Sequence, residues 1–386
     1  SEERGDEPVA DTCTAVYLVP STQSLGFSRN CELQQRRSRR MRSKVVLLGC
    51  AQDAGLPQMG CACQRCAYAR SNPGYEDGMP ACLALVDETE GKVFLIDATP
   101  QLRHQLWYIQ HTNRRGGHPL ELGGILLTHA HAGHYTGLLQ LGKEEADVRD
   151  VPVFCTPSMA SFLQNNQPWA QLVERGNIEI RELDVDETGS NSSSDAVPVS
   201  LTPSLSVLPV LVPHRAELSD TVAYVVTIKS SRGEYAAAST TAPLSSTSQP
   251  ATPAAISSRQ KVVTLLYCPD TDGWSGWKRA IRSWCEDVDV ALLDATFYSK
   301  DELKGRDMSE VSHPIAQVTM AELLGCKAEV VLIHLNHTNP LLTADSPERA
   351  KALAAGFKVG TFGMEWGLPS EEPSDNNAQN RLPIVI

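Results

Sequence analysis

Residues 123–134 read GGILLTHAHAGH, a short apolar run followed by three histidines. The apolar run predicts a buried strand. In an extended segment His129 and His131 share one side, and His134 can return to the same point if the chain turns at Gly133 and begins a helix. Imidazole binds zinc, iron and manganese at neutral pH. The stretch therefore predicts a metal site rather than a polar loop, since the chain has only 10 histidines.

The same stretch resembles the signature H-x-H-x-D-H of the metallo-β-lactamase superfamily, with Gly133 where the superfamily usually has Asp. The resemblance implies an α/β fold of the αββα type, in which two mixed β-sheets are packed between helices. In that superfamily the Asp binds the second of two metals. Its replacement predicts one active-site ion, or a weak second ion completed by water. Gly133→Asp is then expected to raise occupancy of the second site.

The composition bounds the class of protein. The chain has 386 residues, of which 41% are hydrophobic, which is ample for a large core. A net charge of −12 argues against a general nucleic-acid binder. No apolar run approaches the roughly 20 residues that span a bilayer. We expect a small-molecule substrate, no membrane or nucleic-acid partner, and a reducing location in the cytoplasm or an organelle rather than secretion. A homodimer is left open.

The chain divides into a tail and one domain. Residues 1–43 begin acidic and end in a basic tract, which reads as a solvated tail, a targeting remnant or a nucleic-acid contact. Residues 44–386 read as a single metallo-β-lactamase-like domain. Two stretches rich in small and polar residues predict flexible insertions, at 184–204 and at 230–260. The second insertion is expected to join the two strands of a hairpin.

Apolar and periodic runs place the elements of this domain. Strands are expected near 44–49, 82–86, 92–96, 152–155, 177–183, 205–213, 221–228, 262–267, 288–293, 329–333 and 357–361. Helices are expected near 101–111, 135–141, 157–165, 274–285, 310–324 and 346–355. Residues of metal-ligand type repeatedly follow the strands, namely Asp97, His129, His131, His214, Asp270, Asp294 and His334. Loops at one edge of a rigid sheet commonly carry the chemistry of such folds. Asp97, at the end of a buried strand, is placed to hold the backbone of the metal loop or a ligand histidine.

A second cluster, Cys61, Cys63 and Cys66, packs three thiols into one loop. Structural zinc wants four ligands in a tetrahedron, often three cysteines and one histidine. A fourth ligand must then come from a distant part of the chain. Three reduced thiols without a metal are the alternative.

The superfamily resemblance assigns a role to each ligand-type residue. It implies that His129, His131 and His214 hold the first metal. It implies that Asp270 bridges the two metals. His134 and His334 would hold the second. Zinc, manganese or iron would suit these ligands. A metal-bound water with a pKa of about 7 would attack the substrate as hydroxide.

Longer motifs resemble two narrower families. The segments CACQRC (61–66), FLIDATP (94–100), GRDM (305–308) and HLNHTNP (334–340) resemble the coenzyme PQQ synthesis protein B family. The resemblance covers residues 44 to about 368, nearly all of the chain outside the tail. The phosphoribosyl cyclic phosphate phosphodiesterase of phosphonate degradation is also similar. Its extra zinc is bound by C-x-C-x2-C and by a His after the last active-site ligand. That resemblance implies a structural zinc on Cys61, Cys63, Cys66 and His337.

The segment Asp294-Ala-Thr-Phe, followed later by His313, resembles the phosphodiesterase branch that includes tRNA 3′-processing endonucleases. There a comparable His contacts the phosphate or the leaving group, and an imidazole can protonate a leaving oxygen. A helix-capping role for His313 is the alternative. The long tRNA-binding arm of those endonucleases has no counterpart in the sequence.

We therefore expect a metal-dependent hydrolase that acts on a small-molecule phosphodiester or cyclic phosphate, with catalytic roles for His313, Asp270 and Asp294. A biosynthetic or oxidative metalloprotein like PQQ synthesis protein B, with iron, is the main alternative. A non-catalytic metal-binding protein is the third. Fold resemblance alone does not decide among substrates.

Overall fold

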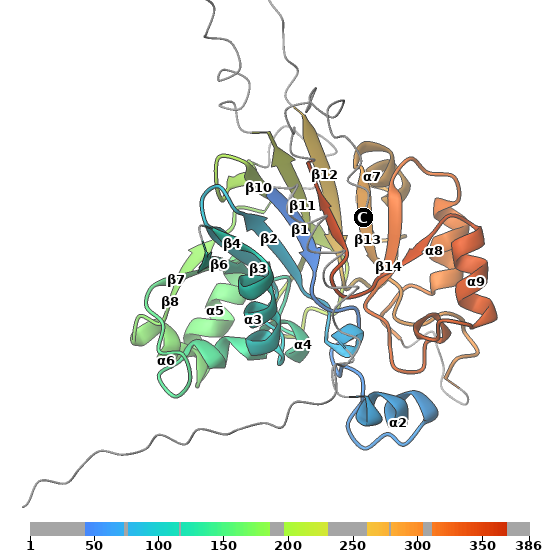
Figure 1. Cartoon of the computed structure of the whole chain (residues 1–386), viewed down its shortest axis with the longest axis horizontal. Coiled ribbons are helices and arrows are strands. Elements are labelled where there is room, and N and C mark those ends of the chain that lie inside the picture. Colours follow the sequence, from blue (N-terminus) through green and yellow to red (C-terminus); the bar gives the residue numbers. More distant parts are fainter. Residues whose placement is uncertain are drawn as a thin grey trace, which may run out of the picture. The chain divides into compact units, whose positions relative to one another are not determined.

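The computed structural model describes residues 43–72, 76–115, 117–185, 197–230, 261–277, 279–303 and 311–368. Two seven-stranded sheets pack face to face, and helices cover the outer face of each (Figure 1). The predicted αββα fold is confirmed. The predictions for residues 1–42, for 231–260 and for the motif at 305–308 concern residues outside these ranges. Part of 184–204 is not a loop, because Val199–Ser200 forms an edge strand.

The first sheet has the order β16-β1-β2-β3-β6-β7-β8. Its strands are β1 (Ser43–Leu47), β2 (Leu83–Asp87), β3 (Lys92–Ile96), β6 (Glu121–Leu126), β7 (Val151–Cys155), β8 (Ile178–Glu182) and β16 (Glu365–Gly367). Pairing is antiparallel from β16 to β3 and parallel from β3 to β8. A separate two-stranded ribbon pairs β4 (Arg114–Arg115) with β5 (His118–Pro119).

The second sheet repeats this mixed pattern in the order β15-β14-β13-β12-β11-β10-β9. Its strands are β9 (Val199–Ser200), β10 (Leu205–Val212), β11 (Thr221–Lys229), β12 (Val262–Cys268), β13 (Val290–Asp294), β14 (Glu329–Ile333) and β15 (Lys358–Val359). Pairing is antiparallel from β9 to β12 and parallel from β12 to β15. The hairpin predicted across residues 230–260 is confirmed by the pairing of β11 with β12.

Strand direction decides where the functional loops lie. β1 and β10 are each separated from a parallel strand by one antiparallel neighbour, so they run with the parallel strands of their own sheet. Within each sheet, the C-terminal ends of all these strands therefore meet at one edge. The loops that follow β1, β3 and β6 in one sheet, and β10, β12, β13 and β14 in the other, carry the ligand-type residues (Figure 1).

The sheets are buried on both faces, which explains their continuous apolar runs. Side chains alternate along a strand. In β1, Val45 and Leu47 pack between the two sheets, and Val46 faces the helices. β12 does the same, because Tyr267 lies between the sheets and Leu266 packs under the helices of the second sheet. The fold therefore has one core between the sheets and one core under each helical layer.

Figure 1 shows one group of helices outside the first sheet and another outside the second. The first group is α3 (Leu102–Thr112), α4 (Ala132–Tyr135), the 3-10 helix η2 (Thr136–Leu141), α5 (Pro157–Asn165) and α6 (Trp169–Glu174). The second is α7 (Ile281–Asp287), α8 (Ala316–Leu323) and α9 (Pro347–Ala354). α5 begins as predicted, with Pro157 in its first turn and the Thr156 hydroxyl accepting a hydrogen bond from the Met159 amide.

Some predicted helices are shorter in the structure. The helix expected over 274–285 begins only at Ile281. Before it, Trp274 and Trp277 are buried and donate their indole N–H groups to Thr319 and Thr271, so tertiary contacts override the helical pattern. The helix expected over 310–324 is α8, which begins at Ala316. The elements α2 (Gln64–Ser71), α6 and β16 were not predicted.

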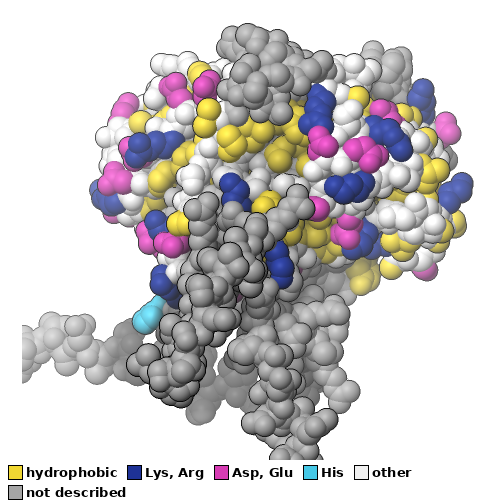
Figure 2. All heavy atoms as spheres, turned by 90° about the horizontal axis from the view of Figure 1, so that it is seen from above, with side chains coloured by type: hydrophobic (Ala, Val, Ile, Leu, Met, Phe, Trp, Pro, Cys, Tyr) yellow, Lys and Arg dark blue, Asp and Glu magenta, His cyan; other side chains and the backbone are white. Residues whose placement is uncertain are grey.

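The surface carries charges of both signs. On the face drawn in Figure 2, Lys and Arg side chains are interspersed with Asp and Glu among the described residues, beside a band of hydrophobic side chains. Among the described residues, no helix is both long and apolar enough to cross a membrane.

Candidate metal centre

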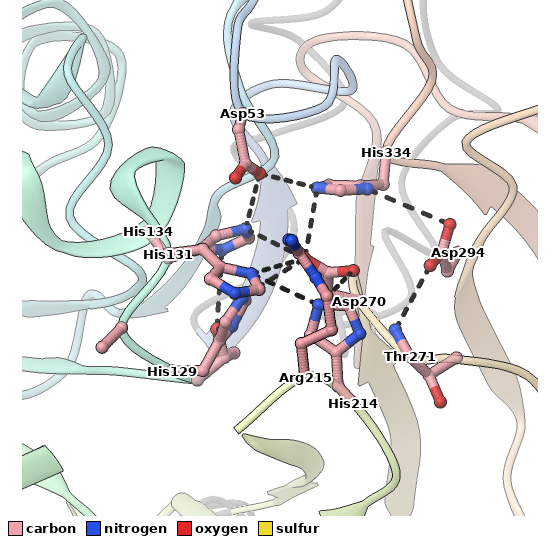
Figure 3. Close-up of polar contacts among 12 residues, drawn as sticks. Asp53, His129, His131, His134, His214, Arg215, Asp270, Thr271, Asp294 and His334 are labelled. Carbon is pink, nitrogen blue, oxygen red and sulfur yellow. Dashed lines mark hydrogen bonds and ion pairs between the residues drawn. The ribbon is translucent and has the colours of Figure 1, made fainter. Parts of the chain in front are cut away.

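Seven side chains from the segments that follow five strands converge at the shared edge of the sheets (Figure 3). They are Asp53, His129, His131, His134, His214, Asp270 and His334. Asp270 lies at the centre and is 2% exposed. Its two oxygens face imidazoles from both halves of the fold, so it belongs to more than one group of candidate ligands.

One group, the three-histidine pocket, consists of His129, His131 and His214 together with Asp270. His214 Nε2 lies 3.3 Å from His131 Nδ1. Two imidazole nitrogens on one tetrahedral zinc would be separated by about 3.3 Å, since each Zn–N bond is about 2.0–2.1 Å. Asp270 approaches His129 Nε2 and His214 Nε2 at 3.2 Å each. The structure thus brings together the three histidines that the superfamily resemblance assigned to one ion.

A second group, the Asp53 pocket, consists of Asp53, His134 and His334 together with Asp270. Asp53 Oδ1 lies 3.0 Å from His134 Nε2 and 3.1 Å from His334 Nε2. Asp270 Oδ2 is 3.7 and 3.9 Å from the same two nitrogens. The carboxylate that the histidine motif lacks is therefore supplied by the loop after β1.

The expectation that glycine at 133 leaves the second metal one carboxylate short is wrong. A Cβ atom at residue 133 would lie 2.5 Å from Asp53 Cα and 2.8 Å from its Cβ and Cγ. Asp53 thus fills the space beside the motif, and glycine at 133 is what makes room for it. Gly133→Asp would push Asp53 away instead of completing the site. Sequence analysis missed Asp53, although it follows β1 in the way that the other ligand-type residues follow their strands.

Four of the five ligand histidines have a polar partner close to the ring nitrogen that faces away from the pockets. His134 Nδ1 lies 2.7 Å from Asp97 Oδ2, and His214 Nδ1 lies 2.9 Å from Asp272 Oδ1. His129 Nδ1 and His334 Nδ1 contact threonine hydroxyls at 2.9 and 2.8 Å. Such partners fix the tautomer and orientation of a metal-binding imidazole. His131 Nε2 has a looser contact, with exposed Glu217 at 3.5 Å.

Asp97 has the role that its place after β3 predicted. Its Oδ1 accepts hydrogen bonds from the amide and the hydroxyl of Thr128, both at 2.9 Å. Its own backbone lies in the left-handed region, with φ 73°, as does that of His334 with φ 59°. These conformations are unfavourable for residues other than glycine. Strained backbone of this kind, at Asp97 and at His334, is typical of a functional site.

Burial and neighbouring charges shift the pKa values of these groups in different directions. Burial lowers the pKa of His129 to about 3, so this imidazole is neutral and free to bind a cation. Burial also disfavours charge on Asp270 and Asp53, but neighbouring imidazoles outweigh it and hold the pKa of each carboxyl well below its usual value. Burial opposes a charge on His134 too, yet Asp97 and Asp53 raise its pKa well above normal. Two ionised carboxylates therefore face a cluster of imidazoles.

His313 is a sixth histidine of the centre. Its Nδ1 lies 2.9 Å from Asp294 Oδ2 and 3.1 Å from Asp270 Oδ1. The side chain is 14% exposed. It is not a helix cap, because Ile315 occupies the N-cap position of α8. Burial lowers the pKa of His313, but Asp294 and Asp270 outweigh this and raise it well above its usual value.

The three cysteines form a separate group with His337, here named the thiolate site. His337 Nδ1 lies 3.6 Å from Cys61 Sγ, 3.7 Å from Cys63 Sγ and 3.6 Å from Cys66 Sγ. Zn–S bonds of about 2.3 Å and Zn–N bonds of about 2.0 Å in a tetrahedron would separate these atoms by about 3.6 Å. Cys66 lies on helix α2 rather than in a loop. A hydrogen bond from the Cys66 amide lowers the pKa of Cys63 to about 6, which favours its thiolate.

Divalent metal ions fit this arrangement. Among the described residues, His129 Nε2 and Asp270 Oδ1 are buried and make no hydrogen bond of good geometry, although charged or polar atoms approach them at 3.1–3.2 Å. Leaving buried polar atoms unpaired is costly, and both atoms point into the three-histidine pocket. Nitrogen and carboxylate ligands suit zinc, manganese and iron, and three thiolates with one imidazole suit zinc.

Comparison with known proteins agrees with this architecture. Residues 92–243 match the family model of the beta-lactamase superfamily domain. The solved structure of zinc-bound PqqB from Methylobacterium extorquens superposes with a TM-score of 0.62 at 21% identity, covering 84% of this chain and 100% of that one. This is the metallo-β-lactamase fold. A diphosphatase of the PhnP family also has it, with a TM-score of 0.54 at 18% identity over 84% of this chain and 97% of that one.

Curated relatives are similar to this chain over most of its length. Coenzyme PQQ synthesis protein B of Klebsiella pneumoniae subsp. pneumoniae is 27% identical over 335 residues, covering 83% of this chain and 96% of the relative. The protein of the same name from Gluconobacter oxydans is 26% identical over 343 residues, covering 84% and 98%. The resemblance to this family inferred from the motifs is confirmed.

Proposed function

We propose that this chain is a metal-dependent hydrolase that cleaves a phosphodiester or cyclic phosphate of a small molecule. The observation that carries the proposal is the position of Asp270. Asp270 belongs to three groups of metal-ligand type, namely the two buried pockets and a third group with Asp294, His313 and His334. Its Oδ1 contacts His313, which also lies on the Asp294 carboxylate. Two cation pockets joined by one carboxylate, with an acid-base group beside them, suit phosphoryl chemistry.

We assign zinc to the thiolate site and zinc, manganese or iron to the other two pockets. Divalent ions held there would supply Lewis-acid polarisation of a phosphoryl oxygen and a water molecule with a pKa of about 7. The solved PqqB structure is zinc-bound, which supports a divalent ion. The PhnP-family relative is a diphosphatase, which supports chemistry at phosphorus.

The residues around the metals would divide the remaining work. His313 Nδ1 is held between Asp294 and Asp270, so Nε2 is the nitrogen left to face a substrate. It would donate a proton to the leaving oxygen, and Asp294 would keep the ring in place. Arg215 follows His214 and lies beside it in Figure 3, with a half-exposed side chain that pairs with Glu217 at 3.6 Å. Its guanidinium would attract an anionic substrate.

A biosynthetic role like that of coenzyme PQQ synthesis protein B is the second candidate. It is favoured by curated relatives that match 83–84% of this chain under that name. The nitrogen and carboxylate ligands would also accept iron. This candidate predicts iron in the centre without hydrolysis of phosphate esters.

Metal analysis combined with a hydrolysis screen separates these candidates. The full chain is purified, its metals are measured, and it is assayed with bis(4-nitrophenyl) phosphate and with 2′,3′-cyclic nucleotides after loading with zinc, manganese or iron. Turnover with zinc or manganese supports the proposal. Iron without turnover supports the second candidate. Zinc or manganese in the purified chain, without activity in any loaded form, supports a non-catalytic metal-binding protein.

One variant tests the assignment of the ligands. His131→Ala removes an imidazole from the three-histidine pocket, so we expect loss of its ion and of hydrolysis while the fold survives. His104→Ala is the matched control, because His104 is an exposed histidine on α3 outside the site. Full metal content and full activity in His131→Ala would contradict the assignment.

A further inference from the structure

The two active-site pockets are built from different kinds of segment. The three-histidine pocket takes its ligands from the ends of β6 and β10, and Asp270 follows β12. The Asp53 pocket takes two ligands from loops that also carry the thiolate site. Asp53 lies in the connection from β1 to α2, which contains Cys61 and Cys63, and His334 lies in the loop after β14, which contains His337.

These two loops are tied together at two places. Near the pocket, the Leu335 amide donates to the Cys50 carbonyl at 2.7 Å, and the Gln52 amide donates to the Leu335 carbonyl at 3.1 Å. This short bridge sets Asp53 beside His334. Farther out, His337 meets the three cysteine sulfurs at 3.6–3.7 Å.

The thiolate site has further contacts that reach back toward Asp53. Arg65 of α2 donates to the carbonyls of His337 and Thr338 at 3.2 and 2.5 Å. The Gln58 amide donates to Cys66 Sγ at 3.4 Å, and Arg70 donates to the carbonyls of Gln58 and Cys61 at 2.8 and 2.5 Å. The connection after Asp53 is thus held to the cysteines along its length.

We propose that the thiolate site assembles the Asp53 pocket. Metal bound by the three cysteines and His337 fixes the two loops that carry Asp53 and His334, and the Asp53 pocket takes up its ion only when these loops are fixed. The three-histidine pocket has no ligand on either loop, so it fills independently. The proposal takes from the proposed function only that the pockets bind metal, and it does not depend on the reaction.

The close fit of Asp53 against Gly133 explains why the Asp53 pocket depends on the position of the loop after β1. In the superfamily signature the second-metal carboxylate belongs to the histidine motif and moves with it. Here the motif position is glycine, and the carboxylate comes from Asp53, whose Cα would be 2.5 Å from a Cβ at 133. The histidine motif contains no carboxylate of its own. If the loop after β1 shifts, nothing in the motif can replace Asp53 as a ligand.

The test uses cobalt as the probe, because thiolate-bound cobalt gives a charge-transfer band that histidine and carboxylate ligands do not give. Apo full chain and its Cys63→Ser, His337→Ala and Asp53→Asn variants are loaded with cobalt, dialysed and analysed for metal per chain. Circular dichroism checks folding. Cys326→Ser is the matched cysteine control, since Cys326 lies outside all the ligand groups.

We expect Cys63→Ser and His337→Ala to fall from about three ions per chain to about one, with loss of the thiolate band. Asp53→Asn should fall to about two ions and keep that band. The control should match the wild type. Loss of a single ion in Cys63→Ser and His337→Ala, with the Asp53 pocket still filled, would overturn the proposal.

A measurement on the wild type keeps the test valid if the cysteine variants do not fold. An organomercurial displaces metal from accessible thiolates, and Cys61 and Cys63 are not buried. Treating the folded, loaded chain should release two ions if the proposal holds, and release of the thiolate ion alone would overturn it. A wild type that binds cobalt only at the thiolate site would contradict both the proposed function and the assembly role. Failure to hydrolyse phosphate esters would contradict the proposed function alone.

Discussion

Each sheet has a buried aspartate at the C-terminal end of a central strand, and each aspartate contacts a threonine and a histidine. These two networks differ in what their histidines face. After β3, Asp97 holds Thr128 and His134, and Thr128 contacts His129. At the end of β13, Asp294 holds Thr296 and His313 in the same manner, and Thr296 contacts His334. The shared design follows from a shared position at the C-terminal end of a central parallel strand.

The difference lies in the histidine that each aspartate touches directly. His134 is 1% exposed, and its far nitrogen faces Asp53 in a metal pocket. His313 has a 14% exposed side chain, and its Nδ1 is already shared by two carboxylates. Under the proposed function, the first network would only hold metal, while the second would also present a histidine to the substrate. Variants in matched positions can test this division.

The largest contrast is expected between His313→Ala and His134→Ala. Removing a general acid lowers turnover by about 10²–10⁴-fold, so His313→Ala should lose activity at that level while keeping its metal. His134→Ala should instead lose the ion of the Asp53 pocket. Turnover and metal content are measured on the same preparations. If His313→Ala loses as much metal as His134→Ala, the two networks have the same role.

The aspartates themselves should show a smaller contrast. Asp97→Asn weakens the support of His134 directly and of His129 through Thr128, so affinity should fall about 10–100-fold in both active-site pockets. Of the five ligand histidines, Asp294 supports only His334, through Thr296 and by a direct contact of 3.9 Å with His334 Nδ1. Asp294→Asn should therefore weaken the Asp53 pocket alone and also lower turnover per bound ion. Competition with a zinc chelator measures the affinities, and equal losses from the two substitutions would remove the distinction.

The sequence pointed to members of both networks. His129, His131 and His134 lie within one short motif after an apolar strand, so local spacing pointed to a metal site there. His214, the third histidine of the three-histidine pocket, was assigned to it only by the superfamily resemblance. Asp97 was expected to hold a loop or a ligand because it ends a strand, and that is confirmed. The apolar runs placed most of the strands, whereas the αββα fold was implied by the resemblance to the metallo-β-lactamase superfamily.

Asp53 could not be found in the same way. It lies in a loop without periodicity, far in sequence from its partners, and its role depends on the space left by Gly133. Only the direction of β1, which runs with the parallel strands, brings it to the site, and pairing direction is not encoded in an apolar pattern. Helix α2 was missed for a related reason. Its short, polar segment is stabilised by contacts of Arg65 with the loop after β14 rather than by an apolar face.

The smallest effect is expected from the threonine hydroxyls that link each aspartate to a ligand histidine. The Thr128 hydroxyl donates to Asp97 Oδ1, so it accepts from His129 Nδ1–H and leaves Nε2 as the metal-binding nitrogen. Thr296 does the same between Asp294 and His334. Valine keeps the shape but removes this hydrogen bond, which contributes about 1 kcal/mol. Thr128→Val should thus weaken the three-histidine pocket roughly five-fold, and Thr296→Val should weaken the Asp53 pocket by a similar factor.

Chelator competition on the two pockets, with serine variants as controls, makes this last test specific. Thr128→Ser and Thr296→Ser retain the hydroxyl, so both should bind metal like the wild type. Nitrogen NMR of the imidazoles reports the tautomer, and in the valine variants His129 or His334 should show a mixture of the two neutral forms. The hydroxyls would have no part in the centre if affinity and tautomer stayed unchanged in both valine variants, because the bound ion alone would then select the nitrogen.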